Sequence, residues 1–297
     1  MVNRLRKDWP FHLLLLPGVI LTFIFSYLPL YGIIMAFENY NPGLGFFRSP
    51  WVGMANFRLV FSQPQFRNTI WNTFYISIFK IVIGTLSSVI FSLLLNEVRR
   101  VAAKRVFQTI VYIPNFISWV IMAGILLNIL ATDGMVNTAL GFLNIPRVQF
   151  ISNRGVFPWT IIVTDVWKTF GFGTVVYLAA ITSIEPELYE SAVIDGAGRW
   201  RQTLHVTIPM LYSIIALMTV LALGNVLNAG FDQVYNLYSP VVYPTGDIID
   251  TYVYRLGLQN GKYAIGTAVG LFKSVISCVL ISSSLYVAYR FANYRVF

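Results

Sequence analysis

Six long apolar stretches constrain this 297-residue chain more than any other feature of its sequence. A transmembrane helix needs roughly 20 mostly apolar residues, because the hydrocarbon core of a bilayer is about 30 Å thick and an α-helix rises about 1.5 Å per residue. The stretches of this length are 11–37, 69–96, 107–131, 157–181, 209–231 and 264–289. Since 57% of the residues are hydrophobic and only 11% are charged, the chain cannot cover a water-facing globule with charge. The sequence predicts an all-α polytopic membrane protein with six transmembrane helices.

The N-terminal stretch and the cysteine content agree with this prediction. The N-terminus is basic, but its apolar run is longer than a secretory h-region and lacks a clear small-residue cleavage site, so we expect a retained first helix. Cys278 is the single cysteine and falls inside the sixth stretch, which excludes a disulfide framework within the chain.

Lysine and arginine residues indicate which side of the membrane each connection occupies. Both ends of a six-span chain lie on one side, and cytoplasmic connections carry the excess of basic residues. A cytoplasmic N-terminus places eleven basic residues in the inside segments and seven in the longer outside loops. The densest cluster is Arg99, Arg100, Lys104 and Arg105. We therefore expect both termini in the cytoplasm, and we assign the net charge of +9 to contact with anionic lipid rather than nucleic acid.

The connection 185–208, between the fourth and fifth spans, is too polar to cross a membrane and is predicted to be cytoplasmic. Good helix formers fill 187–194, Pro186 suits the first turn, and Gly196 suits the end. Ile194 is an apolar residue on an otherwise acidic face, which favours docking into the groove of a protein partner. The alternative is an interfacial helix on lipid headgroups, but such helices usually carry basic residues on the polar face.

This connection resembles the EAA motif of the permeases of binding-protein-dependent ABC importers. That motif reads Glu-Ala-Ala, three residues, Gly, and about nine more residues before a closing Ile-x-Leu-Pro. Here Glu190-Ser191-Ala192, Gly196 and Pro209 fill these places, and Ser191 replaces the middle alanine. The resemblance implies a cytoplasmic coupling helix that docks on an ATPase. The implied docking residues are Glu190, Ser191, Ala192, Ile194, Asp195, Gly196, Ala197 and Pro209.

Further stretches resemble the carbohydrate-importer branch of the same family, so the likeness covers nearly the whole chain. They are residues 53–57, 72–73 and 266–272. The resemblance implies a type I importer permease, with residues 1–297 forming a single transmembrane domain in the bacterial cytoplasmic membrane. It is closest to the subfamily that handles complex or modified oligosaccharides.

The resemblance also implies the partners of this chain. They are a second permease subunit, completing a heterodimer, two ATPase subunits and an extracytoplasmic sugar-binding protein. The sequence has no Gly-x-x-x-x-Gly-Lys-Ser/Thr loop, so we expect no cofactor here and ATP with Mg on the ATPases. Closure of the ATPases would pull the coupling helices together and rock the permeases from inward-open to outward-open. Gly196 would supply the turn after the docked helix, and Pro209 would begin the fifth span.

Four ionisable residues fall within the predicted spans: Lys80, Asp165, Lys168 and Lys273. Each would lie about 12–17 Å deep, where a charge costs on the order of 3 kcal/mol and normally faces a cavity or pairs. Asp165 and Lys168 are three residues apart and are expected to pair, which leaves Lys80 and Lys273 unpaired. Such a cavity would favour an acidic saccharide, such as a uronate. Alternatively, the lysines snorkel or find partners on the second permease.

A sugar path also needs amide groups beside aromatic platforms, because sugars combine hydroxyls with apolar C–H faces. The candidates at suitable depth are Asn225, Asn228, Trp119, Trp167 and Phe170. Helix packing is the competing role for each, since polar side chains in spans join helices by hydrogen bonds worth about 0.6–2 kcal/mol. The outside loop 232–261 would suit docking of a binding protein.

Two other classes of protein share this hydropathy. A membrane-embedded enzyme needs clustered catalytic or metal-binding residues, but the only histidines are His12 and His205, and no His-Glu-x-x-His or Gly-x-Ser-x-Gly motif is present. A self-sufficient carrier normally contains internal repeats, and we find no convincing repeat. We therefore expect a transporter subunit without enzymatic activity or a metal site, although a homodimer would also close the path.

Overall fold

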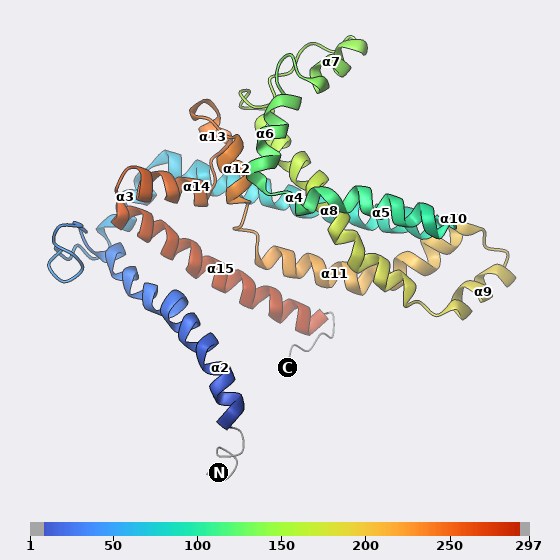
Figure 1. Cartoon of the computed structure of the whole chain (residues 1–297), viewed down its shortest axis with the longest axis horizontal. Helices are drawn as coiled ribbons and strands as arrows, with labels where there is room; N and C mark the ends of the chain where they lie inside the picture. Colours follow the sequence, from blue (N-terminus) through green and yellow to red (C-terminus); the bar gives the residue numbers. More distant parts are fainter. Residues whose placement is uncertain (1–8, 292–297) are drawn as a thin grey trace. The chain divides into compact units, whose positions relative to one another are not determined.

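A computed structural model describes residues 9–291 of the chain (Figure 1). Within these residues the secondary structure is helical apart from one isolated β-bridge, between Glu38 and Trp51. Five of the described helices are long and apolar enough to cross a membrane, and a bent pair makes a sixth span if it is counted as one. The predicted all-α, polytopic fold class is confirmed. Four predicted spans, 11–37, 69–96, 157–181 and 264–289, fall within observed helices.

The chain divides into two compact units. One comprises the chain up to Gln63 together with Val253–Phe272, and the other comprises Pro64–Tyr252 together with the chain from Lys273 on. The first unit contains the N-terminal span, Phe11–Phe37. Its elements are α2 (Trp9–Thr22), η1 (Phe23–Tyr27), η2 (Leu28–Phe37), α3 (Ala55–Ser62), η5 (Tyr254–Gln259) and the start of α15 (Tyr263–Phe291).

Two long helices, α4 (Pro64–Glu97) and α8 (Phe157–Thr182), form the frame of the second unit and pack side by side. Small residues set their close approach. A Cβ atom at Gly173 would lie only 2.6 Å from Ser88 Oγ, and that hydroxyl donates to the carbonyl of Phe170 at 3.0 Å. Small and hydroxyl side chains are typical of helix pairs in membranes, because they let the backbones approach closely.

Other elements of the second unit gather at opposite ends of α4 (Figure 1). At its C-terminal end lie α9 (Pro186–Ile194) and α10 (Arg199–Gln202), and Arg199 forms a 3.2 Å ion pair with Glu97. At its N-terminal end Asn72 donates to the carbonyl of Pro244 at 3.1 Å. The elements there are α12 (Phe231–Leu237), η4 (Pro240–Val242), α13 (Tyr243–Gly246) and α14 (Ile249–Val253). Because a 34-residue helix is about 50 Å long, α4 separates these two groups by more than a hydrocarbon core.

The stretch predicted as the third span, 107–131, is not one continuous helix. It falls in α5 (Val101–Phe116) and α6 (Trp119–Ile129), which meet at an angle of 104°. Pro114 lies in the last turn of α5, where it cannot donate a helical hydrogen bond. Ser118 then adopts an extended conformation and caps α6 by accepting a hydrogen bond from the Ile121 N–H. A short helix, α7 (Met135–Phe142), follows.

The fifth span also differs from its predicted bounds of 209–231. One helix runs from Arg199 to Gly224 through α10, the π-helical η3 (Thr203–Thr207) and α11 (Ile208–Gly224). Pro209 therefore lies inside this helix, and the prediction that it begins the span is wrong. A π-turn directly before Pro209 accommodates it: the Ile208 N–H bonds to the carbonyl of Thr203, five residues back. Pro209 itself has no N–H that would need an acceptor in the preceding turn.

Candidate functional site

Lys80 lies at the centre of a polar network between α4 and α8. Its ammonium is 3.2 Å from Asp165 Oδ1 and donates to the carbonyl of Ala229 at 2.8 Å and to Gln233 Oε1 at 2.5 Å. Only 10% of the Lys80 side chain and 21% of the Asp165 side chain is exposed. These bonds offset the cost of removing the charges from water. The prediction that Lys80 is unpaired is wrong.

Gln233 holds this network in place, although no sequence pattern identified it. The side chain is fully buried on α12, and its amide nitrogen donates to the carbonyl of Ile161 at 2.8 Å and to Thr164 Oγ1 at 2.9 Å. Its oxygen accepts from Lys80, so both ends of the amide are fixed. Residue 233 was expected in an outside loop, and only the turn after α11 returns it to α8.

Gly230 permits the close approach of that turn to Lys80. Its φ is +94°, and a Cβ atom there would lie 3.0 Å from Lys80 Nζ. A residue with a side chain would strain the backbone and crowd the ammonium group. Glycine at this position therefore lets the turn present the Ala229 carbonyl to Lys80.

Lys168 has different partners from those predicted. Its ammonium donates to the carbonyl of Asn115 at 2.9 Å and lies 5.3 Å from the centre of the Trp119 ring, a cation–π contact. Asn115 is in the last turn of α5, where backbone carbonyls have no helical partner and the helix dipole attracts a cation. The break between α5 and α6 therefore provides the partner for Lys168, and the predicted Asp165–Lys168 pair is wrong.

Lys273 is also paired, contrary to the sequence-based expectation. Its ammonium lies 2.5 Å from Asp250 Oδ1 and donates to Asn228 Oδ1 at 2.8 Å. Asp250 was expected in an outside loop, but the structure places it on α14, within reach of α15. All four of the ionisable residues expected in the membrane thus have polar partners in this chain.

A cavity of about 280 Å³ adjoins the Lys80–Asp165 pair. We call it the Lys80 cavity, and its polar lining comes from Ser77, Lys80, Asp165, Asn225 and Asn228. Both asparagines lie in the turn after α11 rather than inside the fifth span. The Ser77 hydroxyl is buried and has no hydrogen-bond partner within the described part of the chain. Because the lining holds one cation and one carboxylate, the Lys80 cavity offers donors and acceptors to a hydroxyl-rich ligand without favouring an anion.

The three aromatic candidates do not line the Lys80 cavity. Trp119 contacts Lys168, and Trp167 is 47% exposed on α8. Phe170 packs edge-to-face on Phe91 with ring centres 5.4 Å apart, and it lines a neighbouring cavity of about 340 Å³ that Lys80 also borders. Of the predicted aromatic platforms, only Phe170 lies beside a cavity next to the ion pair.

The predicted coupling helix is present as α9 and ends in a left-handed glycine. Gly196 has a φ of +75°, and its N–H bonds to the carbonyl of Val193 at 3.0 Å, while the Ala197 N–H bonds to the carbonyl of Ala192 at 2.8 Å. These two bonds form a Schellman motif, in which glycine ends a helix by satisfying its last carbonyls. The predicted helix from Pro186, with Gly196 ending it, is confirmed.

The loop carries an exposed apolar surface. The Ile194 side chain is 86% exposed. Val193 on α9 and Trp200 on α10 are also largely exposed, and neither was among the predicted docking residues. The Tyr189 hydroxyl lies 2.9 Å from Thr207 Oγ1 and so links α9 to η3. Among the other predicted docking residues, Glu190, Ser191, Asp195 and Pro209 are exposed, whereas Ala192 and Ala197 are half-buried.

Long apolar helices, a polar cavity between them and an exposed helix at one end of α4 define a membrane transport subunit. The chain belongs to the family described as binding-protein-dependent transport system inner membrane component, whose model matches residues 80–293. It is therefore a permease subunit of an ABC importer in a membrane, and the prediction of a transporter subunit rather than an enzyme is confirmed.

Curated relatives and solved structures match nearly the whole chain. Protein LplB of Bacillus subtilis (strain 168) is 39% identical over 294 residues, covering 99% of this chain and 92% of the relative. The polygalacturonan/rhamnogalacturonan transport system permease protein YteP of the same strain is 37% identical, covering 96% and 89%. A chain in the crystal structure of a bacterial ABC transporter involved in the import of the acidic polysaccharide alginate superposes with a TM-score of 0.89 at 38% identity, covering 97% and 98%. In a bacterial alginate ABC transporter in complex with an alginate pentasaccharide-bound periplasmic protein, the match has a TM-score of 0.90 at 37% identity, covering 100% and 99%. The chain thus has the type I importer permease fold.

Proposed function

We propose that this permease subunit imports oligosaccharides that contain uronic acids. The observation that carries the proposal is the chemistry shared by two proteins that the chain matches over nearly its whole length. One relative is named for polygalacturonan, a polymer of galacturonic acid, and one structural match imports alginate, an acidic polysaccharide. Both substrates are chains of sugar rings that carry carboxylates.

The polar groups along α4 and α8 suit the hydroxyls of such a substrate. The Lys80 cavity is bordered by the amides of Asn225 and Asn228, next to the Lys80–Asp165 pair. Lys80 and Lys273, which were expected to be unpaired and so to attract an acidic substrate, are paired within the chain. The Lys80 cavity therefore contributes hydrogen bonds to sugar hydroxyls, and the carboxylates of the substrate bind at another part of the chain.

We infer that transport is driven by separate ATPase subunits, which hold ATP and Mg, and that α9 is the coupling helix that docks on one of them. The exposed side chain of Ile194 and the left-handed Gly196 turn support this role. A second permease would complete the path as a heterodimer, and a sugar-binding protein would dock on the loop 232–261. The basic cluster around Arg99 supports cytoplasmic termini in a bacterial inner membrane.

The proposal is tested by reconstituting the importer with its partner subunits and binding protein in proteoliposomes. Uptake and ATPase stimulation are measured with trigalacturonate, with its methyl ester, which keeps the rings but removes the charge, and with maltotriose. We expect stimulation and uptake with trigalacturonate and none with maltotriose. Stimulation by the neutral sugars alone would overturn the proposal.

A further inference from the structure

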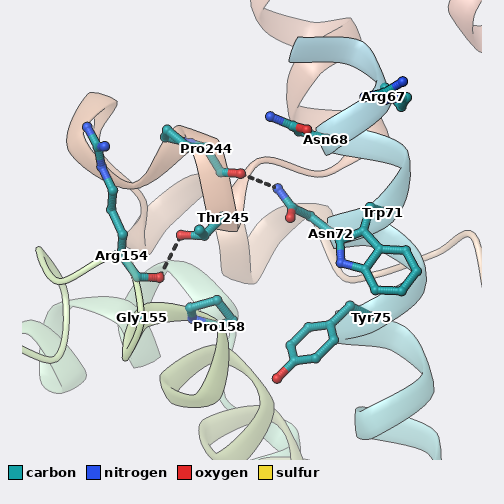
Figure 2. A pocket seen from close by; sticks show the side chains of 10 residues that line it. All are labelled: Arg67, Asn68, Trp71, Asn72, Tyr75, Arg154, Gly155, Pro158, Pro244 and Thr245. Atoms are coloured by element: carbon teal, nitrogen blue, oxygen red, sulfur yellow. Dashed lines mark hydrogen bonds between the residues drawn. The ribbon is translucent and has the colours of Figure 1, made fainter. Parts of the chain in front are cut away.

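Another cavity lies at the N-terminal end of α4 and shares no lining residue with the Lys80 cavity. Its volume is about 640 Å³, within the range of roughly 300–1,000 Å³ that is typical of small-molecule sites. Figure 2 shows its three walls: the first turns of α4, the segment that leads into α8, and α13. We call it the Arg67–Arg154 cavity. Its lining includes Arg67, Asn68, Trp71, Tyr75, Arg154 and Thr245.

The charge of this cavity is entirely positive. Arg67 and Arg154 line it, and no aspartate or glutamate is among the described residues of its lining. The Arg67 side chain is exposed and has no hydrogen bond or ion pair within residues 9–291. Arg154 donates only its Nε–H, to the carbonyl of Val241 at 2.8 Å, so its terminal nitrogens retain donors for a ligand. An anion is therefore the ligand that this lining favours.

Side-chain hydrogen bonds hold the three walls together. Asn72 of α4 donates to the carbonyls of Pro244 at 3.1 Å and Asp247 at 3.2 Å. Thr245 of α13 donates to the carbonyl of Arg154 at 2.7 Å. Figure 2 shows both of the bonds that connect residues lining the cavity. A site whose walls are already fixed loses less entropy when a ligand binds.

Aromatic and amide groups complete a recognition set for a sugar ring. Trp71 is 70% exposed, and Figure 2 shows its ring beside that of Tyr75 on α4, with the Asn68 amide directed toward α13. Exposed tryptophans also occur as anchors at membrane interfaces, where they need no facing wall. Here Trp71 belongs to the lining of a walled cavity that also includes Arg67 and Arg154. An indole face suits the apolar C–H face of a sugar, and a guanidinium matches a carboxylate with two parallel hydrogen bonds.

We propose that the Arg67–Arg154 cavity is a saccharide subsite that selects uronate-containing substrates. Arg67 and Arg154 bind the carboxylates, Trp71 contacts the ring face, and Asn68 bonds to ring hydroxyls. This inference rests on the proposed function and locates its acid selectivity, because the paired charges of the Lys80 cavity favour no anion. Thr245 positions Arg154 by donating a hydrogen bond to the backbone carbonyl of Arg154.

The test measures direct binding of radiolabelled trigalacturonate to the assembled permease–ATPase complex in nanodiscs, without the binding protein. The variants are Arg67→Gln with Arg154→Gln, Trp71→Ala, and Arg147→Gln as a matched control, because Arg147 is an exposed arginine that lines neither cavity. We expect the double variant to raise the dissociation constant for trigalacturonate by about tenfold or more, the range expected for lost bonds to a charged group. Trp71→Ala should weaken binding of trigalacturonate and of its methyl ester alike, and Arg147→Gln should change neither.

Two further results would overturn the inference while leaving the proposed function intact. In the first, the double variant binds trigalacturonate as the wild type does, although the wild type imports it. In the second, the double variant keeps its affinity for trigalacturonate, and a separate assay with the binding protein added shows that it has lost affinity for that protein, which would make the cavity a protein-docking surface. A comparison within the wild type does not depend on folding of any variant: equal affinity for trigalacturonate and its methyl ester would also overturn the inference. Failure of the wild type to import uronates at all would overturn the proposed function first.

Discussion

Lys80 on α4 and Asp165 on α8 lie 3.2 Å apart, and this ion pair joins the two helices that frame the second unit. The sequence predicted that Lys80 is unpaired and that Asp165 pairs with Lys168, and the structure contradicts both expectations. The pair is supplemented by Gln233 and by the carbonyl of Ala229, so the ammonium has three acceptors. Removal of one member would leave the other charged group without its main partner.

We therefore expect Lys80→Met and Asp165→Asn each to destabilise the protein by on the order of 3 kcal/mol, because breaking a buried pair leaves a charge uncompensated. The double variant Lys80→Met with Asp165→Leu should be less destabilised than the sum of the single variants. The measurement is thermal stability of the purified subunit in detergent. The control is Arg199→Gln, which breaks the exposed Arg199–Glu97 pair and should cost less than about 1 kcal/mol. Equal losses at both pairs would contradict the structural importance of Lys80.

Gly230→Ala should destabilise the turn that delivers Ala229 to Lys80. The left-handed backbone costs a non-glycine residue about 1–2 kcal/mol, and the new methyl group would press on the ammonium. Gly124→Ala is the matched control, because Gly124 lies within α6 with open space around its Cβ position, and alanine favours a helix by about 1 kcal/mol. Gly230→Ala should therefore lower the midpoint temperature of thermal unfolding, whereas Gly124→Ala should raise it. A neutral Gly230→Ala variant would argue against the observed turn.

Ile194→Asp should abolish recovery of an ATPase when the tagged permease is purified in mild detergent, because it places a charge on the most exposed apolar side chain of α9. Gly196→Pro should do the same, since proline cannot adopt a φ of +75°. Leu143→Asp is a matched control at a 70% exposed leucine outside the coupling loop, and it should retain the ATPase. Retention of the ATPase by Ile194→Asp and Gly196→Pro would refute docking through α9.

The orientation of the chain can be tested by labelling with a membrane-impermeant maleimide. Cys278→Ser removes the single native thiol. In that background we expect Arg147→Cys to react in intact cells and Arg100→Cys to react only after the membrane is opened, because the basic cluster of residues 99–105 should be cytoplasmic. Both positions are exposed in the structure, so access to water does not distinguish them. The reverse labelling pattern would invert the proposed topology.

Much of the coupling loop could be predicted from local sequence. A helix from Pro186 to Ile194 and a glycine that ends it depend on residues close together in the chain, and the structure contains both. Exposure of Trp200 could not be predicted in the same way, because it depends on how α10 continues into the span. The prediction that Pro209 begins the fifth span was wrong, because a π-turn lets proline lie within a helix. Hydrophobic periodicity does not predict such a turn.

For the ionisable residues of the candidate sugar path, the sequence predicted the depth along each helix but not the partners. Depth along a helix follows from residue count, so the four ionisable residues could be placed in the membrane from sequence alone. Their partners depend on features distant in sequence: Lys168 bonds to a carbonyl that the α5–α6 break makes available, and Lys273 meets Asp250 across a chain reversal. Gln233 was not predicted as a site residue, because its burial depends on the turn after Gly224.

The sequence by itself determined that this protein is a helical membrane protein, that 185–208 forms a helix-bearing loop, and that the chain resembles an importer permease. These properties follow from hydrophobic length and local backbone preference, which are written along the chain. Only the tertiary structure decided which charges pair and where cavities lie, because both depend on which helices meet. The Arg67–Arg154 cavity is the clearest case, since α4, the segment before α8 and α13 supply its walls from positions at least 79 residues apart.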